Sequence, residues 1–170
     1  KEARQDFTLL ILANAVVGAV MMALGYAFMD GLLGAMALSP GVFGYCHTYL
    51  SSYLSFTIPI LLMYNFSLYL IAAGRATLSL VCTVAGGVTN ILLDYLLIAV
   101  ADMGIRGAAI ATGLGYSITA VVGLVVFCRR DQLLRFQRPA FRGRMLLQAA
   151  SNGLSELATS LVSGITTLLF

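Results

Sequence analysis

Long stretches without charge dominate this sequence and limit what the chain can fold into. The first, Phe7–Met29, contains 23 residues and no Asp, Glu, Lys or Arg. At about 1.5 Å per residue, a helix of this length spans the roughly 30 Å hydrocarbon core of a bilayer. The stretch is also too long for the apolar core of a signal peptide. We therefore expect a transmembrane helix here.

Four more stretches of the same kind follow along the chain. They are Leu50–Ala72, Ala76–Ala101, Gly107–Cys128 and Leu146–Phe170. Only Asp94 and Glu156 add charge within them. The whole chain has 10% charged residues and a mean hydropathy of +0.94, whereas a soluble domain has about a quarter of its residues charged. The sequence predicts an all-α integral membrane protein with five transmembrane helices.

The basic residues predict how these helices are oriented. If successive helices alternate in direction, the N-terminal lead, Arg75 and the connection 129–145 lie on one side of the membrane. Together they carry nine of the ten basic residues, and Arg106 alone lies on the other side. Cytoplasmic loops carry an excess of Lys and Arg. We therefore expect the connection 129–145 in the cytoplasm and the turn 102–106 outside.

The connection 129–145 is rich in arginine, with Asp131 as its single acid. Such a run could bind nucleic acid, but its only aromatic residues are Phe136 and Phe141 and it lies between two expected membrane helices. Basic residues beside a membrane helix attract anionic lipids. We expect Arg129–Arg144 to contact anionic lipid headgroups, and we expect no nucleic-acid partner.

Asp94 is the one acid inside the third stretch, and Asn90 lies four residues before it. Residues four apart share a helix face. Thr112 lies as far after position 103 as Asp94 lies before it, so an antiparallel hairpin would bring both to one depth. An acid in mid-membrane costs about 2.5–3.5 kcal/mol on insertion scales and is usually functional. These three residues predict a site for Na⁺ or a proton. The alternative is an acid held by a helix end or a neighbouring side chain.

Two features concern how the helices pack. Gly107, Ala111 and Gly115 recur every four residues, a pattern that lets a neighbouring helix approach closely. Pro59 lies near the middle of the second stretch and is expected to kink it, because the ring removes a backbone hydrogen bond. Pro59 is therefore a hinge candidate.

Glu156 allows two interpretations. It lies twelve residues after Arg144, so it is either an acid at the cytoplasmic interface or a group that contributes to substrate or ion coupling. No nucleophile–base pair, metal-ligand cluster or glycine-rich phosphate loop is present in the sequence. We expect neither an enzyme nor an ATP-driven pump, and no cofactor besides Na⁺ or H⁺ as a coupling ion.

Three segments resemble a known family. Asn90-Ile-Leu-Leu-Asp94, the break with Gly104, and Gly107-Ala-Ala-Ile-Ala-Thr112 are similar to the signature in helices five and six of the multidrug and toxin extrusion (MATE) family. Asn152-Gly-Leu-Ser-Glu156 resembles the start of helix seven in bacterial members.

The resemblance implies a place for each part of the chain. The five helices would be helices three to seven of a twelve-helix transporter with two lobes. Residues 1–128 would form part of the N-terminal lobe with four transmembrane helices, 129–145 the cytoplasmic connection between lobes, and 146–170 the first helix of the C-terminal lobe. The chain is then a piece of a longer protein, and the remaining helices are its partners in a bacterial cytoplasmic membrane.

The resemblance also implies an activity. MATE transporters export organic, often cationic, drugs and toxins in exchange for Na⁺ or H⁺. In one branch of the family, an aspartate and an asparagine of helix five and a threonine of helix six bind the cation; they match Asp94, Asn90 and Thr112. That site also uses an aspartate of helix one, which this chain does not contain. A helix-seven glutamate of another branch lies deeper than Glu156. The alternatives are a lipid-linked saccharide flippase of the wider superfamily and a non-transporting scaffold or channel-like bundle.

Overall fold

The computed structural model describes residues 2–36, 38–129, 136 and 143–169. In this part of the chain the secondary structure is helical throughout, as the sequence predicts. The elements are α1 (Glu2–Ala35), α2 (Pro40–Leu54), α3 (Thr57–Ala72), α4 (Ala76–Asp94), the π-helix η1 (Tyr95–Val100), α5 (Gly104–Cys128) and α6 (Gly143–Leu169).

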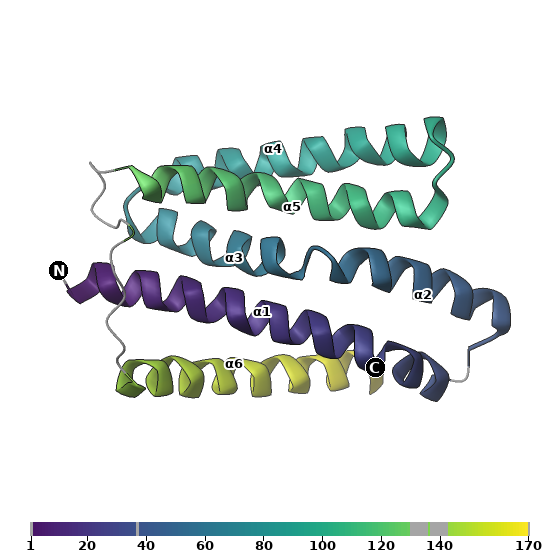
Figure 1. The fold of residues 1–170 in the computed structure, drawn as a ribbon, viewed down its shortest axis with the longest axis horizontal. Coiled ribbons are helices and arrows are strands. Elements are labelled where there is room, and N and C mark those ends of the chain that lie inside the picture. The colour runs from purple at the N-terminus through teal and green to yellow at the C-terminus, as the bar shows by residue number, and fades with distance from the viewer. Residues whose placement is uncertain (1, 37, 130–135, 137–142, 170) are drawn as a thin grey trace.

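The helices run lengthwise through the molecule, and the turns between them gather at its two ends (Figure 1). One end holds the N-terminus, the turn from α3 to α4 with Arg75, and the end of α5 with Arg129; we call it the basic end. The opposite end holds the turn from α1 to α2 and the turn from η1 to α5. This alternation agrees with the helix directions expected from the sequence.

Three of the described helices are long and apolar enough to cross a membrane, namely α1, α4 with η1, and α5. The bent pair α2 and α3 makes a fourth if it counts as one span. Large apolar side chains cover the outside, and Ile91 on α4 is 68% exposed. A surface of this kind suits lipid and not water. The fifth predicted helix corresponds to α6, of which some side chains lie outside the described residues.

The second span differs from the expected Leu50–Ala72. The helical segment begins at Pro40, and it is divided into α2 and α3, which are bent by 55° relative to each other. The helix begins before the predicted Leu50 because Tyr, Ser and His side chains near its start make that part less apolar, although its backbone is already helical.

The bend lies at residues 55–56, one turn before Pro59. Pro59 has no N–H to donate to the carbonyl of Ser55, and its ring crowds that same carbonyl. The backbone N–H of Phe56 bonds to the carbonyl of Tyr53, which tightens the end of α2. The proline therefore accounts for a break one turn toward the N-terminus from its own position.

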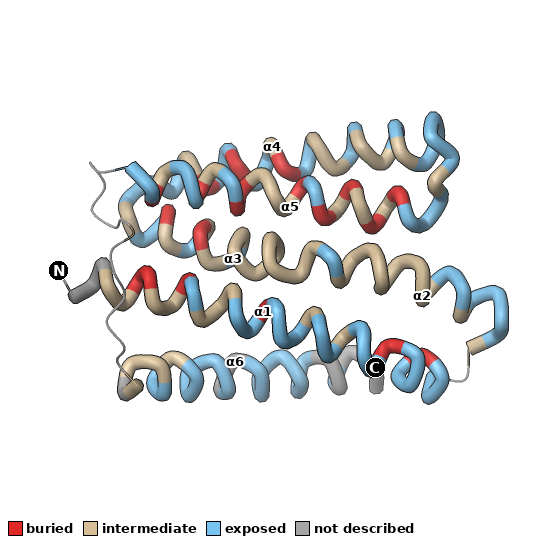
Figure 2. Tube along the Cα trace, viewed as in Figure 1, coloured by how far each residue is buried: buried red, intermediate tan, exposed pale blue. Residues whose placement is uncertain are grey.

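An aromatic cluster fills the core near the basic end. Phe7 of α1, Phe66 of α3 and Phe127 of α5 are almost completely buried. The Phe7 and Phe127 rings lie 5.0 Å apart between centroids, and those of Phe66 and Phe127 lie 5.8 Å apart. Phe136, from the arginine-rich connection, packs on Phe7 at 5.3 Å. Buried residues also concentrate along α5 (Figure 2), which is therefore the central helix of the fold.

A pair of amides joins α1 to α3 within the membrane-spanning region. The Asn14 Nδ2 group donates to Asn65 Oδ1 at 3.1 Å and to the Leu10 carbonyl at 3.0 Å. Asn65 Nδ2 donates to the carbonyl of Leu61 at 2.8 Å. Side-chain hydrogen bonds between membrane helices contribute modestly to stability, because the separated helices find other partners.

We expect Asn14→Ala and Asn65→Ala each to lower the free energy of unfolding. Because the two amides bond to each other, their effects should be coupled by about 0.6 kcal/mol, with an upper bound of about 1.7 kcal/mol. The measurement is a double-mutant cycle by equilibrium unfolding in detergent micelles. Strictly additive effects would show that the pair contributes nothing beyond the packing of each side chain.

Candidate functional site

The helices α4 and α5 approach until their backbones touch. A Cβ atom added at Gly86 would lie 2.7 Å from the carbonyl oxygen of Gly115, and one added at Gly115 would lie 2.8 Å from that of Gly86. Nearer the turn, a Cβ at Gly107 would lie 3.0 Å from the Cβ of Leu97 in η1. Ala111 is fully buried. The close approach predicted from Gly107, Ala111 and Gly115 is therefore confirmed.

The same helix α5 presents glycines to α3. Gly113 lies under the ring of Phe56, at the bend between α2 and α3, and Gly123 lies under the ring of Phe66. In both places the missing Cβ is the space that the ring occupies. The small residues of α5 thus hold α4 on one side and the bent pair on the other.

Asn90 and Thr112 meet between α4 and α5. The Asn90 Nδ2 group donates to Thr112 Oγ1 at 3.3 Å, and the Thr112 hydroxyl donates to the carbonyl of Ala108 at 2.9 Å. Both side chains are half-buried. In the described part of the structure, Asn90 Oδ1 has no hydrogen-bond partner. One amide oxygen and one hydroxyl oxygen therefore remain able to accept a further ligand.

Asp94 ends α4, one turn from Asn90. Its Oδ1 atom is buried and has no hydrogen-bond partner among the described residues. No basic side chain that the structure describes pairs with it. By contrast, Asp30 at the opposite end has the ring nitrogen of His47 at 3.4 Å. Asp94 is therefore a carboxylate without an ion-pair partner among the described side chains.

The depth expected for Asp94 was wrong by about one turn. Asn90, and not Asp94, is level with Thr112, as their hydrogen bond and the contact of Gly86 with Gly115 show. One reason is that the turn lies at residues 101–103, so its centre precedes position 103. A second contribution is η1, the π-helix that follows Asp94. Each π-helical hydrogen bond closes over one residue more than an α-helical one, so this side of the hairpin uses more residues for the same rise. π-helical turns are frequent at functional sites.

A cavity of about 250 Å³ lies beside this pair, between α3, α4 and α5. Its lining combines hydroxyls, an amide, a thioether, a phenol and bare backbone, from Met63, Thr83, Gly86, Gly87, Asn90, Thr112, Gly115, Tyr116 and Thr119. No charged residue is among these lining residues, and Asp94 is not one of them. The cavity therefore suits a ligand of mixed polarity next to the Asp94 region.

Sequence reasoning missed several of the lining residues. On α5, Thr112, Tyr116 and Thr119 are spaced by four and three residues, which is the spacing of one helix face. On α4, Thr83 and Asn90 are seven residues apart. A search for polar residues at helical spacing in both stretches would have found this face. The contribution of α3 through Met63 depends on tertiary packing and carries no such signal.

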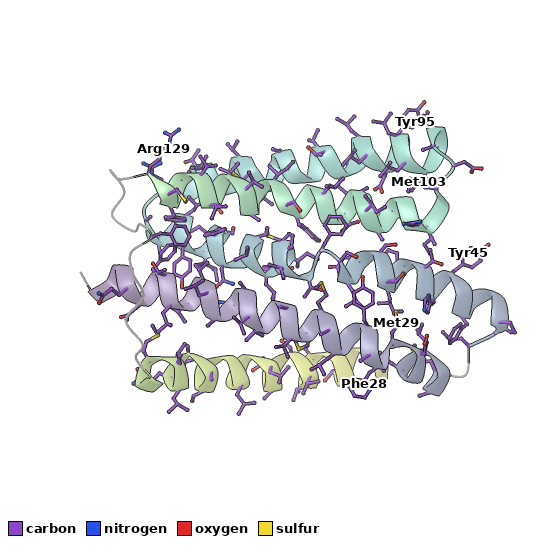
Figure 3. All side chains as sticks on the ribbon, viewed as in Figure 1. Phe28, Met29, Tyr45, Tyr95, Met103 and Arg129 are labelled. Atoms are coloured by element: carbon purple, nitrogen blue, oxygen red, sulfur yellow. The ribbon has the colours of Figure 1, made fainter. Side chains whose placement is uncertain are left out.

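Other predicted site residues are not brought together with these. Glu156 lies in α6, but its side chain is outside the described residues. Arg129 is exposed at the basic end (Figure 3), and the rest of Arg129–Arg144 lies almost entirely outside the described residues. Pro59 lies in the first turn of α3. No group of three or more His, Cys, Asp or Glu side chains that could hold a metal ion exists among the described residues.

Several apolar helices long enough to cross a membrane, packed around a cavity with a partly polar lining, are features of a multi-pass membrane protein. The sequence model of the MatE family matches residues 1–96, more than half of the chain, and the chain belongs to this family of membrane transporters. The match ends within η1, so the second half of the resemblance, around Gly107–Thr112, lies beyond it. Neither the curated proteins nor the solved structures contain a significant match. Members of the MatE family are transporters and not enzymes.

Proposed function

We propose that this chain is part of an antiporter that exports organic, often cationic, compounds in exchange for Na⁺ or H⁺. The observation that carries the proposal is the buried Asp94 Oδ1 atom, which has no partner among the described residues and lies one turn from the hydrogen-bonded Asn90 and Thr112. A charge in this position is costly unless something neutralises it. A proton or a small cation would do so.

The available oxygen atoms suit either ion. Carboxylate, amide and hydroxyl oxygens are the ligands that hard cations prefer. Asp94 Oδ1 and Asn90 Oδ1 have no partner in the described part of the chain, and Thr112 Oγ1 already accepts one bond. A sodium ion would need more ligands than these three residues supply, from water or from other helices of the transporter. A proton would need Asp94 alone.

The remaining assignments belong to the same proposal. The basic end faces the cytoplasm, with Arg129–Arg144 near anionic lipid headgroups, in a bacterial cytoplasmic membrane. Residues 1–128 are part of one lobe, 129–145 connect the lobes, and 146–170 begin the second lobe. Transport would follow from the lobes rocking around a shared cavity, with Pro59 at a hinge.

The test is transport by the intact transporter in proteoliposomes. A Na⁺ gradient or a pH gradient is imposed, and movement of N-methylacridinium, a permanently charged planar cation, is followed by fluorescence. We expect one gradient to drive counter-movement of this cation. Movement of a lipid-linked saccharide without a gradient would instead indicate a flippase. Ionic conductance without exchange would indicate a channel. Either result would overturn the proposal.

A further inference from the structure

Tyrosines of α2 and α5 form a row that leads away from the cavity. Tyr116 of α5 lines the cavity itself. The rings of Tyr49 and Tyr53 on α2 stack, with 5.8 Å between centroids and 11° between planes. Phe56, three residues after Tyr53, packs on Gly113, three residues before Tyr116, so both tyrosines lie within about one turn of this contact between the two segments. The row Tyr116–Tyr53–Tyr49 thus extends from the cavity toward the opposite end, since α2 begins at that end.

Two phenol groups of this row make no hydrogen bond within the described part of the chain. Neither Tyr53 nor Tyr116 has a hydrogen-bond partner among the described residues, although both are half-buried. Buried tyrosine hydroxyls usually have a partner. Tyr26 shows the usual case, because its hydroxyl lies 2.6 Å from the carbonyl of Ser51 and 2.8 Å from Ser55 Oγ.

The cavity needs such groups if its ligand is a cation. Its described lining contains no carboxylate, and Asp94 lies outside it. Aromatic rings attract cations to their faces, and the attraction grows when water is excluded. The tyrosine rings would then compensate the charge of an organic cation, while Asp94 stays available for the coupling ion.

We propose that Tyr116, Tyr53 and Tyr49 form a cation–π track that binds organic cations and leads them from the cavity toward the opposite end. This inference rests on the proposed export of organic cations and specifies the residues that recognise their charge. The ligand class is an organic cation, because Tyr116 supplies an aromatic ring to a cavity whose lining residues include no charged group.

The experiment compares two probes of nearly the same shape in the intact transporter. N-methylacridinium is permanently charged, whereas acridine is uncharged at alkaline pH. Equilibrium binding is measured by fluorescence in lipid nanodiscs without any ion gradient. We expect Tyr53→Leu and Tyr116→Leu to weaken N-methylacridinium binding about 30-fold, which is the size of a desolvated cation–π contact. Acridine binding should change less than about threefold, because it has no charge for the ring to attract.

Further variants keep the test decisive. Tyr53→Phe and Tyr116→Phe keep the ring face and should bind both probes nearly as the wild type does. Tyr53→Met fills similar space without a ring and replaces Tyr53→Leu if the latter does not fold. Tyr95→Leu is the matched control, because Tyr95 extends away from the bundle and is 66% exposed (Figure 3).

Three results would overturn the track. The Leu variants could bind N-methylacridinium as the wild type does, they could lose both probes equally, or Tyr95→Leu could have the same effect. Any of these, together with gradient-driven transport by the wild type, would refute the track and leave the antiporter proposal standing. Selective loss of N-methylacridinium binding without gradient-driven transport would support the track and refute the coupling.

Discussion

Asp94→Asn is expected to abolish export of organic cations in cells and in proteoliposomes. The substitution keeps the shape of the side chain but removes the charge that would hold Na⁺ or a proton. Removing one partner of a buried charge pair costs about 2–5 kcal/mol, which corresponds to at least about a 30-fold loss of cation affinity. A transporter without its coupling ion cannot use the gradient, so drug resistance of the host cells should fall to the level without transporter.

The stability of the same variant tests the site in a second way. Because Asp94 Oδ1 is buried and has no hydrogen-bond partner in the part of the chain that the structure describes, Asp94→Asn should leave the melting temperature unchanged or raise it. Asp102→Asn is the matched control. Asp102 is exposed in the turn before α5 and has φ 51°, a conformation that Asn tolerates. Normal resistance with Asp94→Asn would refute the coupling role, and a lowered melting temperature would point to a structural one.

Gly86→Leu is expected to destabilise the protein more than any other glycine substitution in α4. The new side chain would begin 2.7 Å from the carbonyl oxygen of Gly115, so the helices would have to separate. Overpacking costs about 1–3 kcal/mol even where side chains can adapt. Here the neighbour is backbone, which cannot change rotamer. The measurement is the melting temperature of the detergent-solubilised protein, followed by size-exclusion chromatography.

Gly87→Leu separates folding from function at the neighbouring position. A Cβ atom at Gly87 would have no neighbour within 4 Å, yet Gly87 lines the cavity. We expect this variant to fold like the wild type and to bind organic cations more weakly, because the side chain occupies cavity space. Equal stability of the two leucine variants would contradict the backbone contact between α4 and α5.

The hairpin and its polar pair were predictable from sequence for a simple reason. Asn90 and Thr112 stand out in apolar stretches on either side of a short break, and helical spacing places residues on faces without knowledge of packing. The glycine spacing of α5 predicted the close contact for the same reason. The depth of Asp94 was not predictable, because no sequence signal marked Tyr95–Val100 as a π-helix.

Features that depend on long-range packing could not be predicted from the sequence. The bend at residues 55–56 follows from Pro59, but its place one turn earlier and the fit of Phe56 over Gly113 emerge only when α3 lies on α5. The row of Tyr49, Tyr53 and Tyr116 combines two distant helices. Helix ends were also missed, since α1 extends to Glu2 and Ala35 beyond the predicted Phe7–Met29. Absence of charge marks the lipid-embedded part of a helix, and the helix itself continues past it.

Backbone atoms form the contact between Gly86 and Gly115, and this limits how α4 and α5 move. Side chains accommodate motion by small shifts, but two touching backbones tilt together as a rigid body. If an ion binds at Asp94 as proposed, it would then change the tilt of α4 and α5 relative to the neighbouring helices. The distance between α4 and α5 would stay the same. We expect the chain to bend during such tilting at the junction of α2 and α3. There the chain is already bent by 55° and helical hydrogen bonding is interrupted.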